Sequence, residues 1–370
     1  MNHEFTPVIL AILQENFKDN TKDIYEKSPL LQYLNTKTVS AGRGSKARSG
    51  FANLFAIYVL VEDYLKGDYD TSGKYSEYEG ARFVDLFIRQ RELPFGSKLQ
   101  NHALNARLND EFNKYFPQLR QPPIIRNVET NRYWINENLL KIQLGKDVYN
   151  IAPSVLEIIT AYIQKKRDAF EGFINKCEEL KSIEKAKPKE VEVFVYSLLA
   201  PNVDARLFEI VSYAILKYFF INQIVYFGFT PDDLDEEPLT LYKTGRTNAN
   251  DGGIDFVMRP LGRFFQVTET LDVKKYFLDI DKIQHYPISF VIKSNESIEA
   301  LRDMLEKNAQ ALYPITSIIK KYMDSIEEII NIPMLQDYFS QTIKNGDMPN
   351  VLDEIILQSK VEFNFVDDEE

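Results

Sequence analysis

The fold of this chain is decided by the stretch NDGGIDFVMRPLGRFFQVTET, which spans Asn250–Thr270. The runs IDFVM and RFFQVT are rich in strand-forming residues, and RPLG between them supplies Pro260 and Gly262, which suit a turn. We therefore predict a β-hairpin in which Met258 lies opposite Arg263.

This register determines which side chains share a face of the hairpin. Opposing residues of an antiparallel pair project to the same side, so Asp255 is expected to face Gln266, with Thr268 beside them. Phe265 and Val267 would then pack on the other side. A shift of one residue would undo this arrangement.

The hairpin carries residues that suit a metal ion. Asp255 offers a carboxylate to a hard divalent cation and Gln266 a weaker amide oxygen; Mg²⁺ is commonly held by one or two carboxylates with water and substrate phosphate. Glu209, in the otherwise apolar helical run LFEIVSYAILKYFF, is the candidate second carboxylate. Gly252 and Gly253 would let a phosphate backbone approach closely, because they carry no side chain.

Two simpler interpretations remain open. Strand alternation alone gives many hairpins a polar outer face, which would account for Asp255 and Gln266 without a metal. Glu209 would need no partner if it faced solvent.

A helical glutamate followed by GGID and GRFFQVTE resembles the PD-(D/E)XK nuclease superfamily, above all its type II restriction endonucleases and the related Mrr-type enzymes. The resemblance covers about residues 204 to 292. It implies that Asp255 binds the metal and that Gln266 begins the second half of the motif. It also implies that Val267 contributes only its backbone carbonyl and that Glu209 is an auxiliary acid.

The sequence departs from the family pattern at Thr268, where the family has a lysine. Three explanations are open. The role of the lysine has passed to Lys243, Lys274 or Lys275; metal-bound water suffices without it; or the site no longer cuts. Because Asp255, Glu209 and the paired glycines are present together, we favour the first explanation.

The resemblance implies a type II restriction endonuclease that uses Mg²⁺ to hydrolyse double-stranded DNA at specific sequences. Water would attack the phosphorus in line, the metal would lower the pKa of that water, and the 3′ oxygen would leave, giving 5′-phosphate ends. A homodimer is expected, since two copies of one site most simply cut both strands of a symmetric sequence. The alternatives are a modification-dependent, Mrr-like nuclease and a non-cleaving DNA-binding protein with a degenerate nuclease fold.

Residues that read DNA must lie outside the cutting chemistry, because phosphates carry no sequence information. Three stretches have suitable side chains: Arg43, Lys46 and Arg48 in AGRGSKARSG; Gln100, Asn101, His102, Asn105 and Arg107 in SKLQNHALNARL; and Arg246, Asn248 and Asn250 beside Asp255. Asn101 and Asn105 are four residues apart and would share a helix face. A solvated loop and ordinary helix capping are the simpler interpretations of the first two stretches.

Composition limits the class of protein. With 370 residues, of which 44% are hydrophobic, the chain can bury a large core, and its longest apolar runs fall short of a membrane span. The polar N-terminus is unlike a signal peptide, so we expect a cytoplasmic, and for a restriction enzyme bacterial, location. One cysteine and three histidines suggest neither a disulfide nor a zinc cluster, and no GxxxxGK[ST] motif indicates a nucleotide cofactor.

Charge is unevenly divided along the chain. The net charge is −11, but residues 1–150 carry 20 Lys and Arg against 18 Asp and Glu, and the rest carry 24 against 37. Binding to a polyanion must therefore use a local basic surface. The division fits a DNA-reading N-terminal part joined to a metal-binding part.

Hydrophobic periodicity predicts a mixed α/β fold with a central sheet flanked by helices. The resemblance implies that this fold is of the restriction-endonuclease type. Residues 1–186 are expected to be mostly helical, apart from a hairpin made by RYWINE and LLKIQLG, and to serve in DNA recognition and dimerisation. Residues 187–300 would form the catalytic core, with TPDDLDEEP as an acidic loop and YPISFVIKS as a central strand. Residues 301–370 would be C-terminal helices, with SIEEIINI at the end of one of them.

Overall fold

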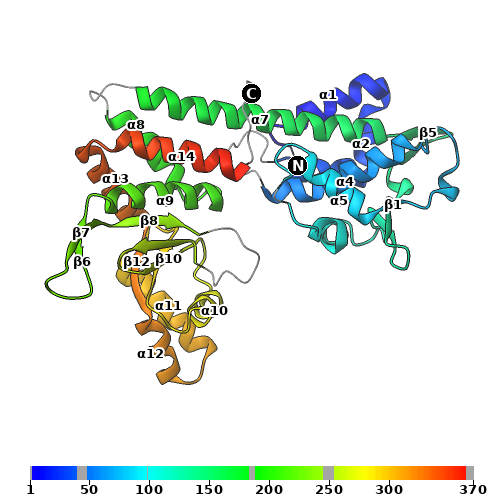
Figure 1. Cartoon of the computed structure of the whole chain (residues 1–370). Helices are drawn as coiled ribbons and strands as arrows, with labels where there is room; N and C mark the ends of the chain where they lie inside the picture. Colours follow the sequence, from blue (N-terminus) through cyan, green and yellow to red (C-terminus); the bar gives the residue numbers. More distant parts are fainter. Residues whose placement is uncertain (1, 40–47, 98, 183–187, 245–253, 364–370) are drawn as a thin grey trace. The chain divides into compact units, whose positions relative to one another are not determined.

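The computed structural model describes residues 2–39, 48–97, 99–182, 188–244 and 254–363 (Figure 1). The chain divides into two compact units, Met1–Phe173 with Lys360–Glu370, and Ile174–Ser359. The boundary expected after residue 186 falls in the segment 183–187, which lies outside the described residues.

Within the described residues, no helix is both long enough and apolar enough to cross a membrane.

The first unit is mainly helical, as predicted. Its helices are α1 (Thr6–Phe17), α2 (Thr21–Lys27), α3 (Pro29–Lys37), α4 (Arg48–Lys66), α5 (Phe83–Glu92), the π-helical turn η3 (Ala103–Arg107), α6 (Leu108–Tyr115) and most of α7 (Ala152–Ser182). Aromatic side chains fill its core: Phe51 packs on Phe55, on Phe95 and on Tyr162 with ring centres 4.9–5.3 Å apart. Such ring pairs add to the apolar burial that holds the helices together.

The predicted pairing of RYWINE with LLKIQLG is wrong. β3 (Arg132–Ile135) instead pairs with β2 (Ile124–Asn127) and β1 (Ala81–Arg82), and β4 (Lys141–Leu144) pairs with β5 (Asp147–Asn150). Each run has its own tight turn: Gly145, with a φ of 62°, closes the turn from β4 to β5. A 3₁₀ turn at Glu137–Leu139 separates the two hairpins.

The second unit is built on a five-stranded mixed sheet with the order β12-β11-β10-β9-β8. The strands are β8 (Thr240–Lys243), β9 (Phe256–Arg259), β10 (Arg263–Thr268), β11 (Ile288–Ile292) and β12 (Ile326–Ile330). β8, β9 and β10 are antiparallel, whereas β10, β11 and β12 are parallel. The predictions of a mixed α/β fold and of an interior strand in YPISFVIKS are confirmed.

The C-terminal part differs from the prediction that it consists of helices alone. It contains α11 (Ile298–Leu312), α12 (Thr316–Asp324), α13 (Ile332–Asn345) and α14 (Met348–Phe363), and SIEEIINI forms β12 instead of a helix end. Three isoleucines of β12 are buried, because packing on a neighbouring strand outweighs the local helical pattern. The acidic loop is also shorter than expected, since DEEP forms β7 (Asp235–Pro238), which pairs with β6 (Ile224–Phe227).

Helices cover both faces of the sheet (Figure 1). α9 (Ala205–Phe220) packs on one face, with the rings of Tyr213 and Phe256 5.2 Å apart and those of Phe220 and Phe265 6.1 Å apart. α10 (Val273–Lys282), α11 and α12 share a core with β11 and β12 on the other. α8 (Pro188–Leu199) and α13 pack on α9. We call these two sides the α9 face and the α10 face.

The predicted register of the decisive hairpin is confirmed. Met258 pairs with Arg263, Val257 with Phe264 and Phe256 with Phe265. Gly262 adopts a φ of 69° in the turn, which explains the preference for glycine there.

Phe265 should be essential for the stability of the second unit. Its side chain is 0% exposed, whereas that of Phe229, near the β6–β7 hairpin, is 94% exposed. We expect Phe265→Ala to lower the free energy of unfolding by about 3–5 kcal/mol, because it leaves a cavity between α9 and the sheet. Phe229→Ala should change it by less than about 0.5 kcal/mol. Hydrogen exchange of the β10 and β11 amides measures both; equal effects would contradict this packing.

Candidate active site

Helix α9 places Glu209 against the sheet. Asp204 caps the helix, its side chain accepting a hydrogen bond from the Arg206 N–H at 2.9 Å. The helix is apolar on nearly every side because it lies between the sheet and the helices α8 and α13. Glu209 is therefore only 6% exposed, and the interpretation that it faces solvent is wrong.

Two cations hold the Glu209 carboxylate. Lys243 Nζ lies 3.1 Å from its Oε1, and the Arg206 guanidinium donates a hydrogen bond to its Oε2. Burial by itself raises the pKa of Glu209, but the charges and hydrogen bonds of Lys243 and Arg206 together lower it below the ordinary value. Glu209 is therefore a buried carboxylate that stays ionised.

Asp255 does not pair with Gln266 as predicted. The Asp255 N–H donates to the Phe265 carbonyl at 2.9 Å, although Phe265 is already the partner of Phe256. Two residues therefore oppose one at the start of β9, which is the arrangement of a β-bulge. A bulge changes the direction of a side chain. The regular alternation of side chains between the two faces of β9 therefore does not extend to Asp255, for which it was assumed.

The bulge brings the Asp255 carboxylate to the α9 face. Its Oδ2 accepts a hydrogen bond from the Val267 N–H at 2.7 Å. Burial and the negative charge of Glu209 raise the pKa of Asp255, while the Val267 N–H, Arg206 and Lys243 lower it. The net result is a pKa of about 7. The two carboxylates therefore interact, and Asp255 titrates near neutral pH in the absence of a metal.

Thr244 fixes the backbone that carries Asp255. The Thr244 N–H donates to the Asp255 carbonyl at 2.9 Å, and its hydroxyl donates to the carbonyls of Ile254 and Asp255. The residues on both sides of the segment 245–253 are thus tied together. Gly252, Gly253, Arg246, Asn248 and Asn250 belong to that segment and lie outside the described residues.

Gln266 and Thr268 project to the α10 face, away from the two carboxylates. Gln266 pairs with Phe290 and Thr268 with Ile292, and both of these neighbours belong to the core under α10 and α11. Gln266 is 8% exposed, and its Oε1 has no hydrogen-bond partner among the described residues. The prediction that Asp255, Gln266 and Thr268 project together is wrong because of the bulge.

Of the three lysines considered as replacements at Thr268, Lys243 lies in the carboxylate cluster. Lys274 and Lys275 are exposed in the first turn of α10, the helix that covers the other face of the sheet. Of these three lysines, Lys243 lies beside the carboxylates, and Lys274 and Lys275 lie on the opposite face of the sheet.

Sequence reasoning missed Lys293 and Arg206. Lys293 follows β11; its side chain is 1% exposed, and its Nζ lies 2.6 Å from Glu269 Oε1 and donates to the Val203 carbonyl. Its own N–H donates to the Thr268 carbonyl at 2.9 Å. The signal was available, because a lysine that ends the apolar run ISFVIK must either emerge from the sheet or find a buried partner.

The cluster suits a hard divalent cation. Asp255 and Glu209 supply carboxylates. A cation between them would offset the two effects that raise the pKa of Asp255, which are its burial and its repulsion by Glu209. The Val267 N–H points to Asp255, and in a strand the carbonyl of a residue lies on the same side as its N–H, so the Val267 oxygen is a suitable third donor. In the described ranges, no three His, Cys, Asp or Glu side chains gather into a metal-binding group.

The residues predicted to read DNA are only partly described. Arg43 and Lys46 fall outside the described residues, and Arg48 begins α4 without a described side chain. The stretch with Gln100 and Arg107 lies in the first unit, where the helix begins at Ala103 and not at the start of the run. The Asn105 N–H donates to the Asn101 carbonyl at 3.1 Å, and His102 Nε2 lies 2.9 Å from Gln100 Oε1.

Comparisons of the chain with family models, with curated proteins and with solved structures found no match. The features that bear on function are therefore the geometry around Asp255 and the motif that contains it.

The raised pKa of Asp255 predicts a pH-dependent stability. Between its ordinary value of 3.8 and about 7, the folded chain holds a proton that the unfolded chain has lost, so stability should fall as pH rises through this range. Asp255→Asn removes this loss of stability, because asparagine does not ionise. Without divalent metal, we expect the free energy of unfolding of the variant to exceed that of the wild type by up to about 4 kcal/mol at pH 8. This difference should vanish near pH 4.

Urea unfolding in EDTA at several pH values measures this difference. Asp303→Asn is the matched control, because Asp303 is exposed on α11 and has no ion-pair partner among the described residues. A pH profile of Asp255→Asn that runs parallel to that of the wild type would exclude a buried, titrating Asp255.

Proposed function

We propose that the chain is a Mg²⁺-dependent endonuclease of the type II restriction class, which hydrolyses phosphodiester bonds of double-stranded DNA. One observation carries the proposal. Asp255, re-aimed by a bulge and held by the Val267 N–H, lies against a second buried carboxylate, Glu209, that is paired with Lys243. A structural role alone does not require two interacting carboxylates in a core.

The proposed roles follow from these contacts. Asp255 and Glu209 would hold Mg²⁺, with the Val267 carbonyl as a backbone donor. The ion would supply a water of lowered pKa and would balance the negative charge that develops on the phosphate. Lys243 would provide the positive charge that Thr268 lacks, because its Nζ already lies at Glu209.

The wider features of the class belong to the same proposal. The α/β unit would be a restriction-endonuclease-like catalytic core, and the helical unit would grip and read DNA. Two copies of the chain would cut the two strands of a symmetric site. Such an enzyme would act in the bacterial cytoplasm.

A non-cleaving DNA-binding protein is the second candidate. Thr268 lies on the α10 face, and Lys243 and Arg206 already compensate the charge of Glu209 without a metal. A modification-dependent nuclease has the same active-site requirements and differs only in its DNA substrate.

Cleavage assays separate these candidates. With phage or plasmid DNA and Mg²⁺, we expect discrete fragments with 5′-phosphate ends, and we expect Asp255→Ala to reduce the rate by at least about 10³-fold because the metal site loses a carboxylate. Asp303→Ala is the exposed control. Cutting of methylated DNA alone would favour the modification-dependent enzyme. Binding of DNA without cutting would favour the DNA-binding protein with a degenerate nuclease fold. Normal cleavage by Asp255→Ala would refute the site.

The lysine assignment has its own test. We expect Lys243→Ala to slow single-turnover cleavage by about 10²-fold or more, since it removes a cation next to the reacting phosphate. Lys274→Ala and Lys275→Ala are the controls, and both should cleave at the wild-type rate. A slow Lys274 or Lys275 variant together with a normal Lys243 variant would reverse the assignment.

A further inference from the structure

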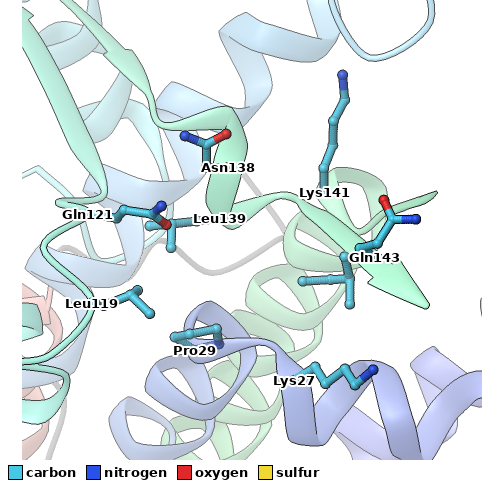
Figure 2. A pocket seen from close by; sticks show the side chains of 9 residues that line it. Lys27, Pro29, Leu119, Gln121, Asn138, Leu139, Lys141 and Gln143 are labelled. Atoms are coloured by element: carbon cyan, nitrogen blue, oxygen red, sulfur yellow. The ribbon is translucent and has the colours of Figure 1, made fainter. Parts of the chain in front are cut away.

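The first unit contains a cavity of about 350 Å³ that is separate from the carboxylate cluster of the second unit (Figure 2). Four segments form it: the end of α2, the start of α3, the connection after α6, and the chain from the 3₁₀ turn into β4. A volume of this size is within the range of small-molecule sites.

The charge of the cavity lining is positive. The described residues that line it include two lysines, Lys27 at the end of α2 and Lys141 on β4, and no Asp or Glu. Lys27 has no ion-pair partner among the described residues. Lys141 Nζ lies 2.9 Å from Glu137 Oε1, and Figure 2 shows its amino group extending away from Lys27. An anionic group in the cavity would give Lys27 a partner.

Carboxamides supply the remaining polar lining. Figure 2 shows Gln121 and Asn138 at the same end of the cavity, next to Leu139. Within the described chain, neither of these two side-chain amides has a hydrogen-bond partner. Each presents a donor and an acceptor, the combination with which Asn and Gln side chains recognise the edges of nucleobases.

Apolar groups complete the lining. Pro29, Leu119 and Leu139 contribute surfaces on which a flat ring can lie. An inorganic anion would use Lys27 and leave these surfaces and the carboxamides without a role. A purely apolar ligand would leave Lys27 without one.

We propose that this cavity binds one nucleotide unit, with the base near Gln121 and Asn138 and the phosphate near Lys27. The unit can be a free nucleoside monophosphate or a nucleotide extruded from DNA, since both present the same base and phosphate. The ligand class follows from the lining alone and does not depend on cleavage at Asp255.

Titration calorimetry of the full chain in EDTA tests the proposal without cleavage. The probes are the four deoxynucleoside monophosphates, the unphosphorylated deoxynucleosides and inorganic phosphate. We expect at least one monophosphate to bind about tenfold or more tightly than inorganic phosphate or its own nucleoside. Lys27→Ala and Gln121→Leu should each weaken this binding by about tenfold. Lys22→Ala, which removes another lysine of α2 outside the cavity, should leave it unchanged.

A second arm distinguishes the source of the nucleotide. Duplex DNA containing 2-aminopurine should become more fluorescent on binding if a base is extruded, and Lys27→Ala and Gln121→Leu should abolish the rise while Lys22→Ala keeps it. Circular dichroism shows whether each variant is folded. Either arm succeeding supports the site and identifies the source. Equal binding of phosphate and monophosphates, or no effect of the two cavity variants in both arms, would overturn the proposal.

Discussion

The candidate site of the second unit depends on the burial of two carboxylates at the same place on the α9 face. Glu209 is kept ionised by Lys243 and Arg206, and its charge then helps to keep Asp255 protonated up to about pH 7. Such a pair is costly in a metal-free core, because one charge must be neutralised by a proton or a cation. The bulge before β9, the Val267 N–H and the Thr244 hydroxyl all hold Asp255 in this position. We therefore interpret the burial of these two carboxylates, despite its cost in stability, as a feature of the proposed metal site.

Much of the fold followed from local sequence patterns. The hairpin register was predictable because RPLG supplies a turn and both flanks are strand-forming, and α9 because its helical pattern follows Asp204. β12 was not predictable in this way, because SIEEIINI has a local helical pattern and becomes a strand only beside β11. The wrong pairing predicted for RYWINE has the same cause. Its strand β3 pairs with β2, and not with the strand in LLKIQLG that the expected hairpin required.

The candidate site was predicted in part. Asp255 and Glu209 were found from their residue types in an apolar setting, and the structure brings them together. Gln266 was placed beside Asp255 by regular alternation, which fails at a bulge that no single residue announces. Lys293 was missed because its partners, Glu269 and the Val203 carbonyl, are distant from it in sequence. Contacts of this kind arise only when the sheet and α9 are assembled.

The most direct test of the central claim is a crystal structure of the full chain with Mn²⁺ in place of Mg²⁺, located by its anomalous scattering. We predict one ion in the second unit, bound by carboxylate oxygens of Asp255 and Glu209 at about 2.1 Å, the distance typical of Mg²⁺ sites. We also predict that the ion displaces Lys243 from Glu209. An ion bound elsewhere, or an intact Glu209–Lys243 pair with no ion beside Asp255, would contradict the account.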